Sequence, residues 1–111
     1  MFENCQGITE VPNILTNIKG DFLSGSFDSM FMNCKNITKV TLACENNMDN
    51  GCFNNMFKGC SKLQRIEYGC SKLGSGTNYN WVKGVANTGI WENLLSKNYN
   101  TYGDSYIPTN W

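Results

Sequence analysis

Apolar residues recur along this chain at two spacings, and each spacing predicts a different element. The segment 53–60 carries four apolar residues at positions i, i+3, i+4 and i+7, namely Phe53, Met56, Phe57 and Cys60. This spacing places side chains on one face of a short helix. In the segments 39–42 and 65–68 apolar and polar residues alternate, which is typical of a strand with one buried face. The pattern therefore predicts short helices and short strands in succession.

These elements belong to an internal repeat. The pattern Met-Phe-x-x-Cys begins at Met1, Met30 and Met56, and a degenerate fourth copy begins at Trp81, with intervals of 29, 26 and 25 residues. One short helix and one short strand cannot bury an apolar face alone, so stacked copies predict a solenoid. The predicted fold class is an α/β solenoid of the leucine-rich-repeat type, with parallel strands on one side and helices on the other. Residues 1–89 would form three repeats and one degenerate repeat, and residues 90–111 an aromatic C-terminal cap.

The repeat resembles the BspA-like leucine-rich repeats, whose units carry a phrase like aFxxCxxLxxLxL. The matching residues are Phe31, Cys34, Ile37, Val40 and Leu42, and then Phe57, Cys60, Leu63, Ile66 and Tyr68. The likeness covers residues 1–70 well and continues loosely through residues 81–89 and 107–111, although the first copy lacks the L-x-L element. The resemblance implies a binding or adhesion module, not an enzyme, exposed on a bacterial surface or a virion.

The first copy begins directly on its apolar Met-Phe pair, although the end of a solenoid needs a polar cap. We therefore expect the chain to be the C-terminal part of a longer array, with the rest of that array as one of its partners. The first residues also lack the charged and apolar regions of a signal peptide.

Composition narrows the classes of function. Nine basic and nine acidic residues give a net charge of zero, which argues against nucleic-acid binding. No apolar stretch approaches the roughly 20 residues of a membrane-spanning helix. Histidine is absent, which excludes histidine-dependent nucleophilic catalysis and the commonest zinc ligand. The carboxylates show no paired acid–base spacing. We expect no catalytic residues, no cofactor and no metal.

Six cysteines in a short chain allow two interpretations. They could form a disulfide framework, or they could be small apolar residues in inward-facing columns. Cys5, Cys34 and Cys60 form one column and Cys44 and Cys70 another, with Val85 and Leu15 in the equivalent positions of other copies. Because a disulfide partner is not freely replaced by valine or leucine, the sequence favours free, buried thiols. The spacing of neighbouring repeats, about 5 Å, leaves bridging along a column open.

Two groups of residues are candidates for binding. On the strands the outward-facing residues would form one column of Glu10, Lys39 and Arg65 and another of Pro12, Thr41 and Glu67. This mixed-charge strip is suited to a protein or a glycan, and the alternative is an ordinary solvated face. In the tail Tyr99, Tyr102 and Tyr106 could form an aromatic platform for sugar rings, or cover the last repeat.

The sequence thus predicts a non-enzymatic binding or adhesion module. The alternative is a structural or receptor-binding tip or spacer of a bacteriophage tail fibre or another virion appendage.

Overall fold

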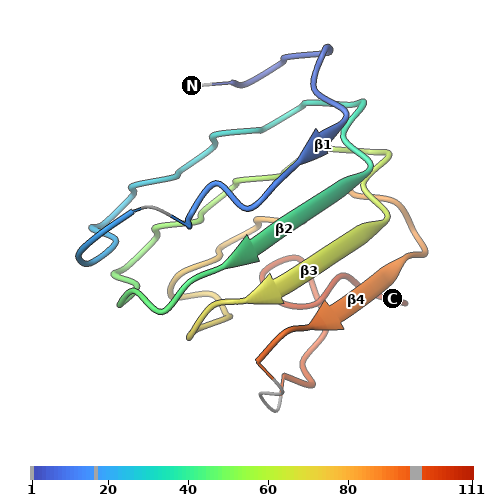
Figure 1. The fold of residues 1–111 in the computed structure, drawn as a ribbon. Helices are drawn as coiled ribbons and strands as arrows, with labels where there is room; N and C mark the ends of the chain where they lie inside the picture. Colours follow the sequence, from blue (N-terminus) through green and yellow to red (C-terminus); the bar gives the residue numbers. More distant parts are fainter. Residues whose placement is uncertain (1, 17, 96–98) are drawn as a thin grey trace.

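The computed structural model describes residues 2–16, 18–95 and 99–111, and its central feature is one parallel sheet of four strands (Figure 1). The strands are β1 (Glu10–Val11), β2 (Lys39–Ala43), β3 (Arg65–Gly69) and β4 (Ile90–Asn93), and they lie in chain order. β2 and β3 are parallel and adjacent, which confirms the prediction of strands at 39–42 and 65–68.

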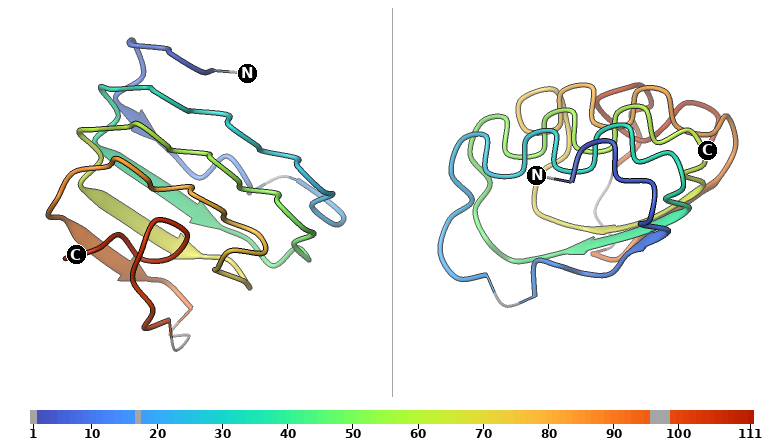
Figure 2. Two further views of the ribbon diagram at one scale, coloured as in Figure 1. Left: turned by 180° about the vertical axis from the view of Figure 1, so that it is seen from behind. Right: turned by 90° about the horizontal axis from the view of Figure 1, so that it is seen from above.

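The predicted fold class is wrong, because the described residues contain no helix. An α/β solenoid with helices opposite the sheet is therefore not what this chain forms. The side opposite the sheet consists of tight turns in residues 22–34, 48–60 and 74–85, here called the turn layer. Figure 2 shows this layer in front of the sheet when the molecule is seen from behind and, from above, as a row of short loops facing the strands. The described chain is an all-β domain with a single sheet.

Backbone hydrogen bonds explain why the turn layer is not helical. Some N–H groups donate to the carbonyl three residues earlier, as Met56 does to Phe53 at 3.1 Å. Alternate N–H groups donate to the next repeat instead, as Phe53 does to Thr77 at 2.8 Å and Phe57 does to Trp81 at 2.9 Å. These groups are then not available for the bonds to residue i−4 that define an α-helix.

In residues 48–60 of the turn layer, every fourth residue from Gly51 onward lies in the left-handed region of φ. Gly51, Asn55 and Gly59 have φ values of 67°, 55° and 79°. Glycine and asparagine adopt this conformation most readily, which accounts for their frequency here. At Gly59 a second constraint applies, because a Cβ atom would clash with Oδ1 of Asn33 in the preceding repeat.

The core lies between the sheet and the turn layer and is built from columns of equivalent side chains. The rings of Phe2, Phe31 and Phe57 are stacked, with centroids 5.5 and 5.6 Å apart and interplanar angles of 9° and 3°. Trp81 continues the column 6.1 Å from Phe57 and is fully buried. The Phe57 N–H donates to the Trp81 carbonyl as the Phe31 N–H does to the Met56 carbonyl. Trp81 therefore takes the methionine position of the repeat, and its ring lies in the core against Phe57, as predicted.

The thiols of the first cysteine column are equivalent as well. Cys34 and Cys60 are fully buried, as predicted. The Cys34 thiol donates to the Phe2 carbonyl at 2.9 Å, and the Cys60 thiol makes the same contact one repeat later, to the Phe31 carbonyl at 3.1 Å. All six cysteines are free in the structure.

β1 ends at Val11, and Pro12 follows it. The side chain of Asn13 replaces the missing pairing. Its Nδ2 donates to the Ala43 carbonyl at 3.0 Å, and its Oδ1 accepts from the Ala43 N–H at 3.2 Å. A side-chain amide therefore takes the place of a peptide group at the edge of the sheet.

The tail begins with β4, so the sheet continues past the predicted boundary at residue 89. β4 pairs in parallel with β3, from Arg65 with Ile90 to Tyr68 with Asn93. Farther on, the tail packs on the last repeat, where Trp81 Nε1 donates to the Tyr106 carbonyl at 3.0 Å. Trp111 Nε1 donates to the Ala86 carbonyl at 2.8 Å. The tail thus lies against the final repeat, as Figure 2 shows.

Candidate binding face

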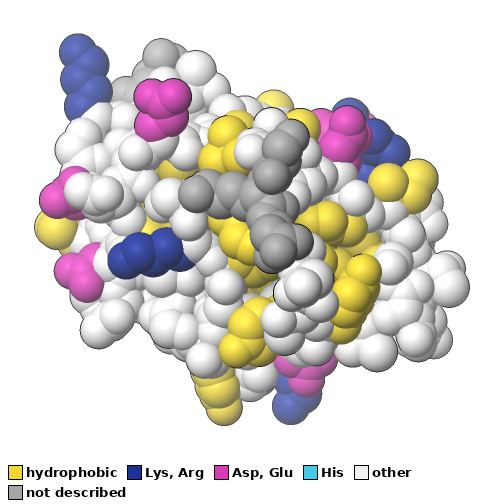
Figure 3. Space-filling model, turned by 90° about the horizontal axis from the view of Figure 1, so that it is seen from below, with side chains coloured by type: hydrophobic (Ala, Val, Ile, Leu, Met, Phe, Trp, Pro, Cys, Tyr) yellow, Lys and Arg dark blue, Asp and Glu magenta, His cyan; other side chains and the backbone are white. Residues whose placement is uncertain are grey.

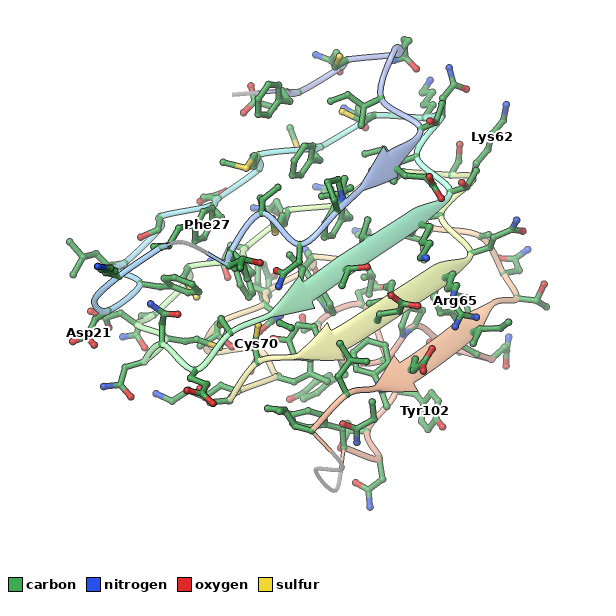
Figure 4. The ribbon with its side chains drawn as sticks, viewed as in Figure 1. Asp21, Phe27, Lys62, Arg65, Cys70 and Tyr102 are labelled. Atoms are coloured by element: carbon green, nitrogen blue, oxygen red, sulfur yellow. The ribbon has the colours of Figure 1, made fainter. Side chains whose placement is uncertain are left out.

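The outer face of the sheet brings the predicted strand residues together in register. Along β2 the side chains of Val40 and Leu42 are fully buried, so those of Lys39 and Thr41 point outward, and β3 repeats this arrangement. Glu10 pairs with Lys39, and Lys39 with Arg65. These three form the first predicted column. In Figure 4 the outer face is turned toward the viewer, with Arg65 labelled on β3.

The second column is only partly as predicted. Thr41 is in register with Glu67, and Glu67 with Glu92. Pro12 lies beyond the last paired residue of β1. Glu92 was not among the predicted residues, although it follows Glu67 by the 25-residue interval of the last copy. That interval was the signal that could have identified it.

Glu67 is the centre of a network of polar contacts. Its carboxylate accepts a hydrogen bond from Thr41 Oγ1 at 2.9 Å and one from Arg65 Nε at 3.2 Å. The ammonium group of Lys39 lies 3.8 Å away, and Arg65 also pairs with the carboxylate of Glu92. The Thr41 hydrogen bond, followed by Arg65 and Lys39, lowers the pKa of Glu67. The network holds side chains from three strands in fixed positions.

A groove of about 560 Å³ lies beside this network at the β1 edge of the sheet. Its lining consists of Thr9, Glu10, Val11, Pro12, Asn13, Lys39 and Thr41. Lys39 and Thr41 therefore belong both to the groove and to the surroundings of Glu67. The groove offers hydroxyl, amide, carboxylate and ammonium groups within one concave surface, which is the set of groups that hydrogen-bonds a polar ligand.

The three tyrosines predicted in the tail do not form one platform. The Tyr99 hydroxyl donates to the Cys70 carbonyl at 2.5 Å, and its ring lies 6.0 Å from that of Tyr68, so Tyr99 anchors the tail. Tyr99 and Tyr106 both line a hollow of about 200 Å³. Tyr102 is 54% exposed and is not part of that lining.

Apolar side chains gather on the side of the molecule formed by β4 and the tail, which Figure 3 shows from below. The exposed large apolar residues in this part of the chain are Ile90, Leu94, Leu95 and Tyr102. Ile90 is in register with Arg65, so this apolar side adjoins the polar sheet face at β4.

Other kinds of site find no support in the described ranges. Residues 2–16, 18–95 and 99–111 contain no cluster of three or more potential metal ligands. The same ranges contain no helix long and apolar enough to cross a membrane.

Comparisons with protein families, curated proteins and solved structures found no match to this chain. The residues and geometry of the sheet face are therefore the basis for inferring a function.

Proposed function

We propose that this chain is a non-enzymatic binding module whose sheet face recognises a polar glycan or a loop of a protein partner outside the cell. One observation carries the proposal: the Glu67 carboxylate accepts hydrogen bonds from Thr41 and Arg65, and the ammonium group of Lys39 lies 3.8 Å from it. Side chains that are already ordered lose little conformational entropy on binding. The BspA-like resemblance implies the same class of function.

The size of the face favours a small ligand. Neighbouring strands are about 4.8 Å apart, so four strands span about 14 Å, and five residues of a strand span about 16 Å. These dimensions give an area of about 220 Å², well below the roughly 800 Å² that each side of a stable protein interface needs. The face and its groove together therefore fit a short oligosaccharide or a single protein loop better than a broad protein surface.

The network is better suited to recognition than to stability. Its ion pairs are partly exposed, with 34% exposure for the Arg65 side chain and 41% for Lys39. Exposed pairs contribute at most about 1 kcal/mol to stability. In contact with a ligand, the same groups would donate and accept charge-assisted hydrogen bonds, which contribute about 1.5–3 kcal/mol each. Changes to the face should therefore affect binding more than folding.

Binding to glycan and peptide arrays tests the proposal with the intact chain and three variants. Lys39→Ala and Glu67→Gln alter the face, and Lys83→Ala removes an exposed lysine of the turn layer as the matched control. We expect each face variant to weaken binding of the selected ligand about tenfold or more, since each loses charge-assisted hydrogen bonds. The control should bind as the wild type does.

Two outcomes would contradict the proposal. The first is a ligand whose affinity is unchanged in both face variants but is lost in Tyr102→Ala, which would place binding on the tail. The second is the absence of any ligand on either array at millimolar sensitivity. Thermal unfolding of each variant shows whether a loss of binding reflects a loss of fold.

A further inference from the structure

Two thiols meet where the second and third strands end. The Sγ atoms of Cys44 and Cys70 are 3.2 Å apart. Cys44 follows β2 directly and Cys70 follows β3 directly, and the last register pair before them is Ala43 with Gly69. The Cys44 N–H still donates to the Gly69 carbonyl at 3.3 Å. The two cysteines are therefore neighbours across the continuing sheet.

The distance between the sulfur atoms and the strand spacing are compatible with a disulfide. Paired residues of neighbouring strands lie about 4.8 Å apart, within the Cα separation of about 4.4–6.8 Å that a disulfide spans. The sulfur atoms need to approach by only about 1 Å to reach the bond length of about 2.05 Å. The Cys70 backbone is held in place, since its carbonyl accepts the Tyr99 hydroxyl at 2.5 Å.

The two thiols also differ in burial and in pKa, and these differences indicate which of them reacts first. Cys44 is half-buried, whereas Cys70 is fully buried. The hydrogen bond between them lowers the pKa of Cys44 and raises that of Cys70. A low pKa and partial exposure make a thiol reactive, whereas burial makes it inert. By contrast, burial raises the pKa of Cys52 to about 11 and that of Cys60 to about 12.

We propose that Cys44 and Cys70 form a reversible dithiol–disulfide site that reacts with low-molecular-weight disulfides. The Cys44 thiolate attacks one sulfur of the small disulfide, forms a mixed disulfide and releases one small thiolate. Cys70 then gives up its proton, which the first small thiolate accepts, and the Cys70 sulfur attacks Cys44 Sγ and releases the second small thiolate, which takes a proton from water. The two protein thiols are oxidised, and the small disulfide is reduced to two thiols.

The product would link the ends of β2 and β3 across 26 residues of chain. This bond joins two consecutive repeats at the end of the sheet, so it would resist their separation. The site is distinct from the polar face, which contains none of the cysteines.

The test exposes the reduced intact chain to oxidised glutathione. After removal of glutathione and unfolding in denaturant, we expect the titratable thiols to fall from six to four. We also expect the chain to lose two hydrogens in mass, and a peptide map should show a Cys44–Cys70 bond. The variant Cys70→Ser should instead keep a glutathione adduct on Cys44, because it lacks the second thiol. Cys5→Ser, which changes another half-buried cysteine, should oxidise like the wild type.

The wild-type map decides the question even if a variant folds poorly. Six free thiols after oxidation, a bond between other cysteines, or a bond between two chains would each overturn the proposal. A glutathione adduct that persists on wild-type Cys44 would overturn it as well, because it would show that Cys70 cannot reach the mixed disulfide.

Discussion

Replacing Phe57 with alanine should remove a fully buried ring from the interior of the core column. Phe57 is fully buried, and its ring centroid lies 5.6 Å from that of Phe31 and 6.1 Å from that of Trp81. Phe→Ala in a packed core costs about 3–5 kcal/mol, because burial is lost and a cavity remains. A domain of this size has a free energy of unfolding of about 5–15 kcal/mol, so this variant should lose a large part of its stability.

Phe2 provides the matched control at the end of the same column. It stacks on Phe31 at 5.5 Å but is 42% exposed. Full burial of phenylalanine contributes about 1.5–3 kcal/mol, so Phe2→Ala should cost only about 1–2 kcal/mol and leave no enclosed cavity. Urea unfolding monitored by far-UV circular dichroism measures both losses of stability. This signal is preferable to tryptophan fluorescence, because Phe57 contacts Trp81. Equal losses in the two variants, or a loss under about 2 kcal/mol for Phe57→Ala, would refute the stacked core.

Three further outcomes follow from the turn layer, the polar face and the core. Gly59→Ala should lower the thermal unfolding midpoint more than Gly25→Ala: both have positive φ, but only Gly59 would also clash, and nothing lies within 4 Å at Gly25. Equal midpoints would mean that the clash is relieved. Thr41→Val should raise the pKa of Glu67 toward its ordinary value, measured by NMR, because the Thr41 hydrogen bond is the main cause of its lowering. A lowered carboxyl pKa stabilises the fold above the unfolded-state pKa and loses this effect as the pH falls, so this variant should lose less stability on acidification. Tyr68 has a pKa raised well above its ordinary value by burial, so stability should fall as the pH rises above about 10. Tyr68→Phe should reduce that alkaline loss, and an unchanged alkaline midpoint would contradict it.

The strands could be predicted from the sequence because their pattern has one physical origin. Alternation of apolar and polar residues places every second side chain on the same face. In β3 the side chains of Ile66 and Tyr68 are accordingly fully buried, and those of Arg65 and Glu67 face outward. The repeat interval indicates which residues share a column, so five residues of the polar face could be predicted, whereas Pro12 lies beyond the pairing and Glu92 was missed.

The turn layer was wrongly predicted to be helical, because two periods fit the same short segment. Positions i, i+3, i+4 and i+7 agree with 3.6 residues per turn, but they agree equally with a unit of four residues. In the structure Cys52, Phe53, Met56, Phe57 and Cys60 are all fully buried, which is a period of four. The residues that distinguish the two are Gly51, Asn55 and Gly59, since glycine and asparagine disfavour a helix and tolerate the left-handed conformation.

Contacts that depend on exact side-chain positions could not be predicted from the sequence. The column of Cys44 and Cys70 was visible, but nothing in its spacing showed that the sulfur atoms lie 3.2 Å apart. Likewise, the sequence left the tyrosines of the tail as either a platform or a cap. Only the hydrogen bond from Tyr99 to the Cys70 carbonyl shows that this ring holds the tail in place.

The two sides of the domain together explain why its outer face could serve recognition. Successive repeats are joined in register on both sides, by the strands of the sheet and by the turn layer, where Phe57 donates to Trp81. The register therefore does not depend on the side chains of the outer face. Substitution of Lys39 or Glu67 should leave the backbone in place while it changes the pattern of charges. A face whose geometry is fixed by the backbone, and whose chemistry is free to vary, is what a binding module requires.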